Sequence, residues 1–284
     1  MSFSSDIKED LSNVINYKNK KILEAETFGF LLTGNTVLND DYVEYSTENE
    51  FIIEKLYKIL FNLQIDYEPE VSGKEYFARI KRGDALNSII KFNINLNEQE
   101  EKALVRGSFL GAGSLTNPSK QYHLEVLFLE KNNAEFIMNI CRKYDIEFKM
   151  IEARNKYQIY LKDAENISKF LALIESNKGV LAFEDTRLTK EIKNNVNRLV
   201  NCETANLNKV VNAAVNQIND IKLIQRLKKF DELSEDLKEI AMLRLENPDM
   251  SLKDLGQLLE KPLGKSGVNH RFQKIHDIAE EYRR

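Results

Sequence analysis

The 284-residue chain contains no tryptophan, four prolines, three histidines and two cysteines. Cys141 and Cys202 are far apart and form no CxxC pair, which excludes a disulfide framework and predicts two reduced, buried thiols. His123, His270 and His276 lack the HExxH and Cys/His spacings of zinc sites. The sequence therefore predicts neither a structural metal nor another cofactor.

An apolar run of about 18 residues is also missing, so we expect no membrane-spanning helix. The first apolar stretch, MSFSSDIKEDLSNVI, contains acidic residues and is unlike a secretory signal. A hydrophobic content of 42% is enough for a packed core, and the length suggests two or three domains. These features predict a cytoplasmic globular protein.

The net charge of -4 is unevenly distributed, because residues 1–180 have a net charge of -5 and residues 181–284 a net charge of +1. From Lys261 to Lys274 the chain has four basic residues and no acidic one. A local cluster of this kind on a nearly neutral chain is typical of a focused phosphate-binding surface.

Carboxylates are absent from a glycine-containing stretch, VRGSFLGAG, at Val105–Gly113. It resembles the signature helix of the LAGLIDADG homing endonucleases, which pack two such helices closely and place a metal-binding Asp at the end of each. Gly107 and Gly113 match that motif, but Leu110 and Ala112 stand at its two Asp positions. Because Mg2+ requires oxygen ligands, the resemblance implies an endonuclease scaffold that has lost its chemistry.

The chain also matches itself. At an offset of 79 residues, Thr27–Gly34 aligns with Arg106–Gly113, which puts Leu31 and Thr33 at the empty Asp positions of a first motif. At an offset of 81, Lys55–Tyr67 aligns with the amphipathic segment after the second motif. Both units predict the same order of helices and strands. The expected fold is α+β, a duplicated αββαββα domain with pseudo-twofold symmetry.

Neither the first motif nor the neighbouring acids restore a metal site. Phe28 aligns with Gly107, and because helices cross closely only where side chains are small, we expect looser packing there. The acids near the motif helices are not at the helix tips, so we expect them to be solvated. These acids are Glu26, Asp40, Asp41 and Glu101.

The carboxyl-terminal third is predicted to be helical. A long helical region begins near Thr189, with apolar residues at a helical period and a break at Asn201–Asn206. Three shorter helices follow, of which the first two are expected to be capped by Ser234 and Ser251. The third follows a turn at Leu263–Gly267. This layout predicts a helix-turn-helix, with a plain three-helix bundle as the alternative.

In a helix-turn-helix the third helix enters the major groove with its amino-terminal residues first. Lys265 and the amides of Gly267 and Val268 are suited to phosphate. Asn269 and Arg271 are suited to the edges of adenine and guanine. The residues predicted to contact DNA, within roughly Ser251 to Arg283, are Lys261, Lys265, Ser266, Gly267, Asn269, His270, Arg271, Gln273 and Lys274.

Taken together, these segments closely resemble the WhiA family. The resemblance implies a degenerate LAGLIDADG-like domain fused to an all-α helix-turn-helix that is similar to sigma-factor region 4. It also implies sequence-specific binding of double-stranded DNA, transcriptional regulation, and a role in cell division and chromosome segregation, or in sporulation in spore-formers. The segments that carry it are RGSFLGAGSLTNP (Arg106–Pro118), YHLE (Tyr122–Glu125), NRLVNCETANL (Asn197–Leu207), ENP (Glu246–Pro248) and GKSGVNHRFQKI (Gly264–Ile275).

Two other functions stay open. One is residual nuclease activity, against which the missing carboxylates argue. The other is a protein-interaction module that docks on RNA polymerase, a sigma factor or the division machinery, which the acidic first 180 residues favour. Basic strand residues could still form a weak DNA-binding saddle, although we favour solvated side chains. These residues are Arg79, Lys81, Lys120, His123, Lys149 and Arg154.

The expected organisation has four segments, and the expected location is the cytoplasm, at the nucleoid. The segments are 1–95, an N-terminal helix and the first repeat; 96–180, the second repeat; 181–232, a helical linker; and 233–284, the helix-turn-helix.

Overall fold

The computed structural model describes residues 2–14, 18–90, 95–153 and 155–283. The chain forms two compact units, residues 1–192 and residues 193–284. Helix α8 (Asn177–Arg226) begins in the first unit and ends in the second. Within the described residues, no helix combines the length and the apolar character that a membrane crossing requires.

The first unit contains two copies of an αββαββα repeat after helix α1 (Phe3–Ser12), as the sequence predicts. The elements of the first repeat are α2 (Lys20–Leu31), β1 (Thr36–Leu38), β2 (Tyr42–Thr47), α3 (Glu50–Leu63), β3 (Tyr67–Ser72), β4 (Glu75–Lys81) and α4 (Asp84–Ile90). Those of the second are α5 (Glu98–Ala112), β5 (Gly113–Leu115), β6 (Leu124–Phe128), α6 (Lys131–Arg142), β7 (Lys149–Ala153), β8 (Lys156–Leu161) and α7 (Ala164–Leu173).

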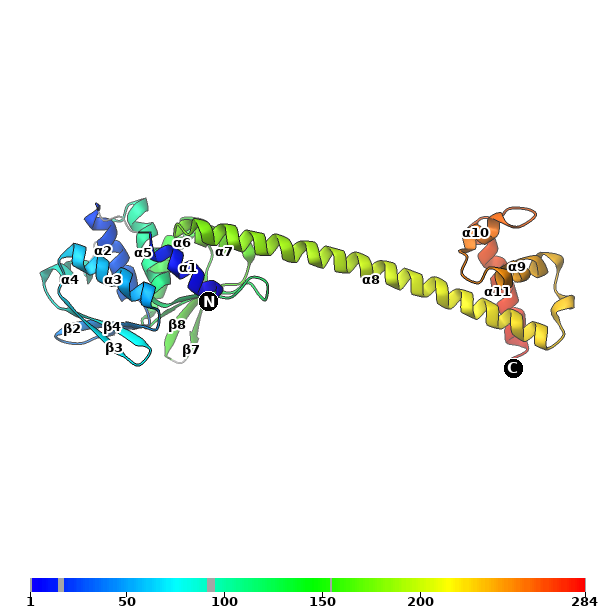
Figure 1. Ribbon diagram of the computed structural model, residues 1–284, viewed down its shortest axis with the longest axis horizontal. Coiled ribbons are helices and arrows are strands. Elements are labelled where there is room, and N and C mark those ends of the chain that lie inside the picture. The colour runs from blue at the N-terminus through cyan, green and yellow to red at the C-terminus, as the bar shows by residue number, and fades with distance from the viewer. Residues whose placement is uncertain (1, 15–17, 91–94, 154, 284) are drawn as a thin grey trace. The chain divides into compact units, whose positions relative to one another are not determined.

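Each repeat folds its strands into an antiparallel sheet, in the order β1-β2-β4-β3 and β5-β6-β8-β7. Val43 pairs with Ile80 in the first sheet, and Leu124 pairs with Leu161 in the second. All four side chains are buried on the side that the helices cover (Figure 1). The paired residues are 81 positions apart in the two sheets, which confirms the predicted offset of 81.

Helices α2 and α5 cross where both have glycine. A Cβ atom added to Gly29 would lie 2.2 Å from the carbonyl oxygen of Leu104, and one added to Gly107 would lie 2.1 Å from that of Glu26. Both distances are far below van der Waals contact, so the two backbones touch and only glycine fits. The looser packing expected at Phe28 is therefore wrong.

This crossing also corrects the alignment of the two motifs. Gly29 and Gly107 are 78 residues apart, and so are the two carbonyls that they approach and the first residues of the two helices. The predicted offset of 79 is one residue too large. The first empty Asp position of the first motif therefore falls on Leu32 instead of Leu31, and the second falls on Gly34 instead of Thr33.

Helix α8 departs from the prediction in its length. It begins at Asn177, well before Thr189, and continues through Asn201–Asn206, where we expected a break. That segment contains neither proline nor glycine, and its weak helix formers disfavour a helix by only a few tenths of a kcal/mol each. Cys202 lies on this helix and is exposed, whereas Cys141 is buried, so only one of the two thiols is buried as predicted.

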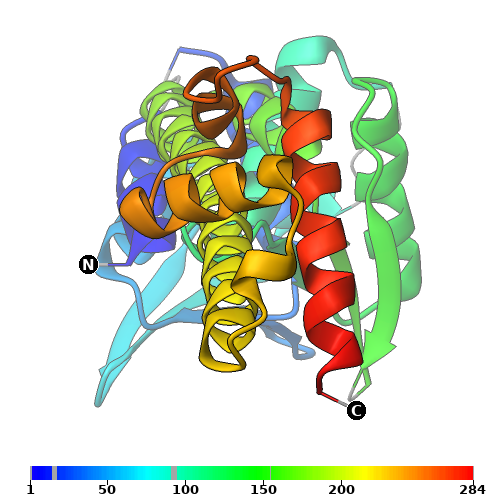
Figure 2. The same cartoon turned by 90° about the vertical axis from the view of Figure 1, so that its right-hand side faces the viewer.

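The second unit packs the end of α8 against three helices, and Figure 2 shows α9 lying across α11. Ser251 caps α10 as predicted, by accepting a hydrogen bond from the amide of Asp254 at 3.3 Å. Ser234 stands at the N-cap of α9 without a side-chain capping bond. The elements are η1 (Phe230–Glu232), α9 (Glu235–Glu246), α10 (Leu252–Gln257) and α11 (Lys265–Glu281). Buried residues of its core include Ile221, Ile240, Leu255, Phe272 and Ile275.

The glycine crossing predicts a strong asymmetry between two Gly→Ala variants. Gly107→Ala forces α2 and α5 apart, so we expect a loss of at least ~3 kcal/mol, the upper end of overpacking costs. Gly83→Ala is the matched control, because no heavy atom lies within 4 Å of the added Cβ. Urea unfolding of the full chain measures both, and equal midpoints for the two variants would contradict the crossing.

Candidate nucleic-acid interface

The ends of α2 and α5 meet where the homing-endonuclease motif would place its carboxylates. Leu110 is fully buried there, and the Thr33 hydroxyl donates a hydrogen bond to a carbonyl of α2 at 2.7 Å. The carbonyl of Gly111 accepts hydrogen bonds from Asn35 at 2.9 Å and Tyr45 at 3.1 Å. In the part of the chain that the structure describes, no three His, Cys, Asp or Glu side chains gather as a metal site would require.

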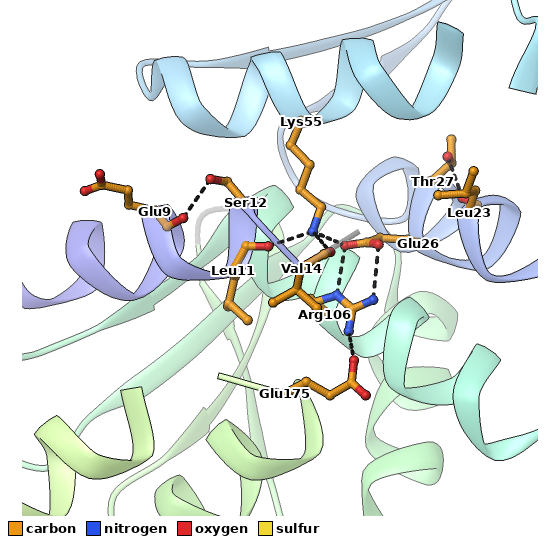
Figure 3. Close-up of polar contacts among 10 residues, drawn as sticks. All are labelled: Glu9, Leu11, Ser12, Val14, Leu23, Glu26, Thr27, Lys55, Arg106 and Glu175. Carbon is orange, nitrogen blue, oxygen red and sulfur yellow. Dashed lines mark hydrogen bonds and ion pairs between the residues drawn. The ribbon is translucent and has the colours of Figure 1, made fainter. Parts of the chain in front are cut away.

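Glu26 is buried, which corrects the expectation that it is solvated. Its carboxylate lies 2.6 Å from Nζ of Lys55 and 3.0 Å from Nε of Arg106, which also pairs with Glu175 (Figure 3). Lys55 also donates hydrogen bonds to two backbone carbonyls at and just after the end of α1. Burial lowers the pKa of Lys55 to about 8, and the charge of Glu26 acts in the opposite direction.

Glu101 is buried as well and is also neutralised by the protein. It pairs with Lys143 and accepts a hydrogen bond from the Tyr144 hydroxyl at 2.7 Å. Asp40 and Asp41 are exposed, as predicted. The two buried acids therefore hold protein cations, and their role is to anchor the helices.

The sheets do not present a surface of unpaired cations. Three of the predicted basic residues are held by carboxylates on the same sheet, which cancels most of their charge. Lys120 and Lys149 are exposed, and Arg154 lies outside the described residues. The pairs are Arg79 with Glu44 and Glu70, Lys81 with Glu68, and His123 with Glu125.

Helix α11 separates an apolar face from a polar one. Val268, Phe272 and Ile275 are buried in the core of the second unit. The helix begins at Lys265, so Ser266 and the partly buried Gly267 lie in its first turn and not before it. The predicted DNA-contacting residues that are exposed are Lys261, Lys265, Ser266, Asn269, His270, Gln273 and Lys274.

The early start of α11 changes which amides can bind an anion. The amide of Val268 donates a hydrogen bond to the carbonyl of Gly264 at 3.2 Å, so the role predicted for it is wrong. The first three amides of an α-helix, here those of residues 265–267, have no intrahelical acceptor. They point outward beside the Lys265 side chain's attachment and keep the predicted role for Gly267.

Arg271 is turned toward α9. Its guanidinium contacts the carboxylates of Asp236 and Glu239, each at 3.4 Å, and donates a hydrogen bond to the Asp236 carbonyl at 3.2 Å. Only 15% of the side chain is exposed. To reach a base edge Arg271 would have to leave these contacts, whereas Asn269 needs no such rearrangement.

Comparison with known proteins identifies the family. Residues 101–193 match the WhiA LAGLIDADG-like domain, and residues 196–279 match the WhiA C-terminal HTH domain. Over 315 aligned positions the chain is 35% identical to a Clostridium acetobutylicum protein named "Probable cell division protein WhiA", covering 100% of this chain and 99% of that protein. The chain belongs to the WhiA family.

Other WhiA proteins are similar in sequence and structure. A Caldicellulosiruptor saccharolyticus protein with the same name is 41% identical over 255 residues, which is 88% of this chain and 73% of that protein. The crystal structure of full-length DUF199/WhiA from Thermatoga maritima matches with a TM-score of 0.67 and 27% identity, covering 99% of each chain. The N-terminal LAGLIDADG domain of DUF199/WhiA shares the fold, with a TM-score of 0.56 and 23% identity over 61% of this chain and 90% of that one.

Sequence reasoning missed three basic residues of this WhiA-family chain. Lys209, Arg244 and Lys253 line a cleft of the second unit together with Lys265. Arg244 had a recognisable signal, because it lies seven residues after Leu237, on the same face of α9, and that face is buried. We expected only apolar side chains there.

The Glu26 network predicts a stability defect that does not depend on metal. Glu26→Gln leaves Lys55 and Arg106 without their shared carboxylate, so we expect a loss of about 3–5 kcal/mol. Asp40→Asn, at an exposed position, is the control. Thermal unfolding is measured with and without Mg2+. Stabilisation of the unchanged chain by Mg2+ that disappears in Glu26→Gln would mean that Glu26 is a metal ligand.

Proposed function

We propose that this chain is a sequence-specific DNA-binding regulator without nuclease activity, which serves cell division and chromosome segregation. The observation that carries the proposal is the solvent-facing side of α11, where amide, imidazole and ammonium groups follow one another on a helix-turn-helix. The match to the WhiA C-terminal HTH domain and the names of the relatives support it. Such a protein would act at the nucleoid.

In the proposed complex, α11 enters the major groove with its first turn against the backbone. Lys265 and the amides of residues 265–267 hold a phosphate oxygen, because the amino end of a helix favours negative charge. Asn269 reads adenine, and His270 and Gln273 contact neighbouring base edges. Lys261 and Lys274 add attraction to the phosphates on either side. Arg271 orients α11 through its contacts with α9.

For the first unit we propose a protein-binding role, with RNA polymerase, a sigma factor or the division machinery as partner. Duplex DNA requires a surface of unpaired cations, and Arg79 and Lys81 are held by carboxylates instead. The net charge of -5 in residues 1–180 adds repulsion from phosphate. The open sheet faces keep the shape of an endonuclease without its affinity for DNA.

Two substitutions in α11 separate phosphate binding from sequence reading. Lys265→Ala should weaken binding to every duplex and reduce the salt dependence by about one unit of slope. Asn269→Ala should cost ~1–3 kcal/mol on a duplex selected from a random library and little on other duplexes. A mobility-shift titration measures both, with Lys228→Gln as the control. Binding that neither change affects would place the DNA-binding surface outside α11.

Loss of the carboxylates predicts that plasmid DNA stays supercoiled in the presence of the protein and Mg2+ or Mn2+. The assay runs at protein concentrations that saturate DNA binding, so that weak nicking is visible on a gel. Nicking that disappears when Glu26 or Glu101 is replaced by Gln in a folded variant would overturn the non-enzymatic proposal.

A further inference from the structure

A cleft of about 380 Å³ lies within the second unit, between the carboxyl-terminal half of α8 and the helix-turn-helix. Its apolar lining comes from Val210, Ala213 and Ala214 of α8 and from Leu252 of α10. A volume of this size is several times that of a phosphate group. The cleft therefore has room for the organic group to which a phosphate is attached.

The polar lining of the cleft is basic. Lys209 of α8, Lys253 of α10 and Lys265 of α11 all line it, and none of the lining residues is acidic. All three lysines are exposed, and none forms an ion pair with a described residue within 4.0 Å. Three ammonium groups from three different helices repel one another across a shared space unless an anion lies between them.

Behind the lysines, Arg244 of α9 also lines the cleft, although only 2% of the residue is exposed. Its hydrogen-bond partners are uncharged. Nε donates to the side-chain oxygen of Gln217 at 3.0 Å, and a terminal nitrogen donates to backbone carbonyls, the shortest bond being 2.7 Å to Met250. The guanidinium also lies 5.4 Å from the ring centre of Phe272.

A buried guanidinium without a carboxylate keeps much of its desolvation cost. Burial lowers the pKa of Arg244 below its ordinary value, and the charge of Asp249 acts in the opposite direction. Within the described residues, no carboxylate forms an ion pair with Arg244. Arg106 of the first unit shows the contrast, because its buried guanidinium pairs with Glu26 and Glu175.

We propose that this cleft binds the phosphate of a sugar phosphate, with Lys209, Lys253 and Lys265 around the oxygens and Arg244 at the base. The apolar residues of α8 and α10 would lie against the sugar. The phosphate comes either from the DNA backbone or from a free nucleotide. The first source rests on the DNA binding proposed above and would make α8 part of the DNA-binding surface; the second does not depend on it.

The first arm of the experiment tests the DNA backbone as the source. Lys209→Gln and Lys253→Gln are made in the full chain, and the affinity for duplex DNA is measured as a function of salt concentration. Each variant should reduce the slope of log affinity against log salt by ~0.9, because one phosphate contact is lost. The control is Lys228→Gln, an exposed lysine of the same unit that does not line the cleft.

The second arm tests a free ligand. Deoxythymidine 5′-phosphate and inorganic phosphate are titrated into the 15N-labelled full chain, and the Nε–H resonance of Arg244 is followed and assigned with Arg244→Lys. The resonance should shift and saturate, at lower concentration for the nucleotide because the apolar lining contacts the sugar. In the Lys209→Gln, Lys253→Gln double variant, the apparent Kd should rise at least tenfold.

The outcomes are distinct. A reduced salt slope in both cleft variants supports a backbone phosphate, and an unchanged slope with a saturating Arg244 shift supports a free nucleotide. An unchanged slope without a shift overturns the phosphate site, even if Lys265→Ala still weakens DNA binding. If the unchanged chain binds no duplex, the proposed function fails and the titration alone decides the cleft.

Discussion

The backbone contact between α2 and α5 is the constraint on which the first unit depends. Gly29 and Gly107 bring carbonyl groups of the opposite helix within a distance that no side chain tolerates. This contact joins the two repeats into one core and fixes both sheets beneath them. It also encloses Glu26, whose carbonyl Gly107 approaches, so that the carboxylate must be neutralised inside the protein. Lys55 and Arg106 supply that charge, since water is excluded there.

The same contact explains how the fold can persist without metal chemistry. Close packing needs small residues at the crossing, whereas a metal site needs acids at the helix ends, and the two requirements fall on different positions. At the ends, Leu110 is buried and the carbonyl of Gly111 is satisfied by Asn35 and Tyr45. No unbalanced charge is left there that a divalent cation would relieve. Shape and catalysis are therefore separable in this scaffold.

Periodicity and self-similarity predicted the repeated αββαββα order and the sheet register, because both depend on local pattern. They misaligned the motif by one residue, since Phe30 and Phe109 look equivalent in sequence while the contact between backbones is set by Gly29 and Gly107. Burial of Glu26 could not be predicted, because its partners are distant in the sequence. In α11, spacing predicted the exposed face, but Arg271 was assigned to DNA because its acidic partners lie on another helix.

Basic residues have opposite consequences in the two units. In the first, Arg106 and Lys55 share a buried carboxylate, so their charge stabilises the fold without any ligand. In the second, Arg244 is buried among carbonyl and amide oxygens, which stabilise a cation through dipoles but leave its net charge unbalanced. A fold that keeps such a charge loses stability unless an anion restores the balance. The energetic cost of Arg244 in the free protein is therefore also a contribution to binding, because it is relieved only when phosphate enters the cleft.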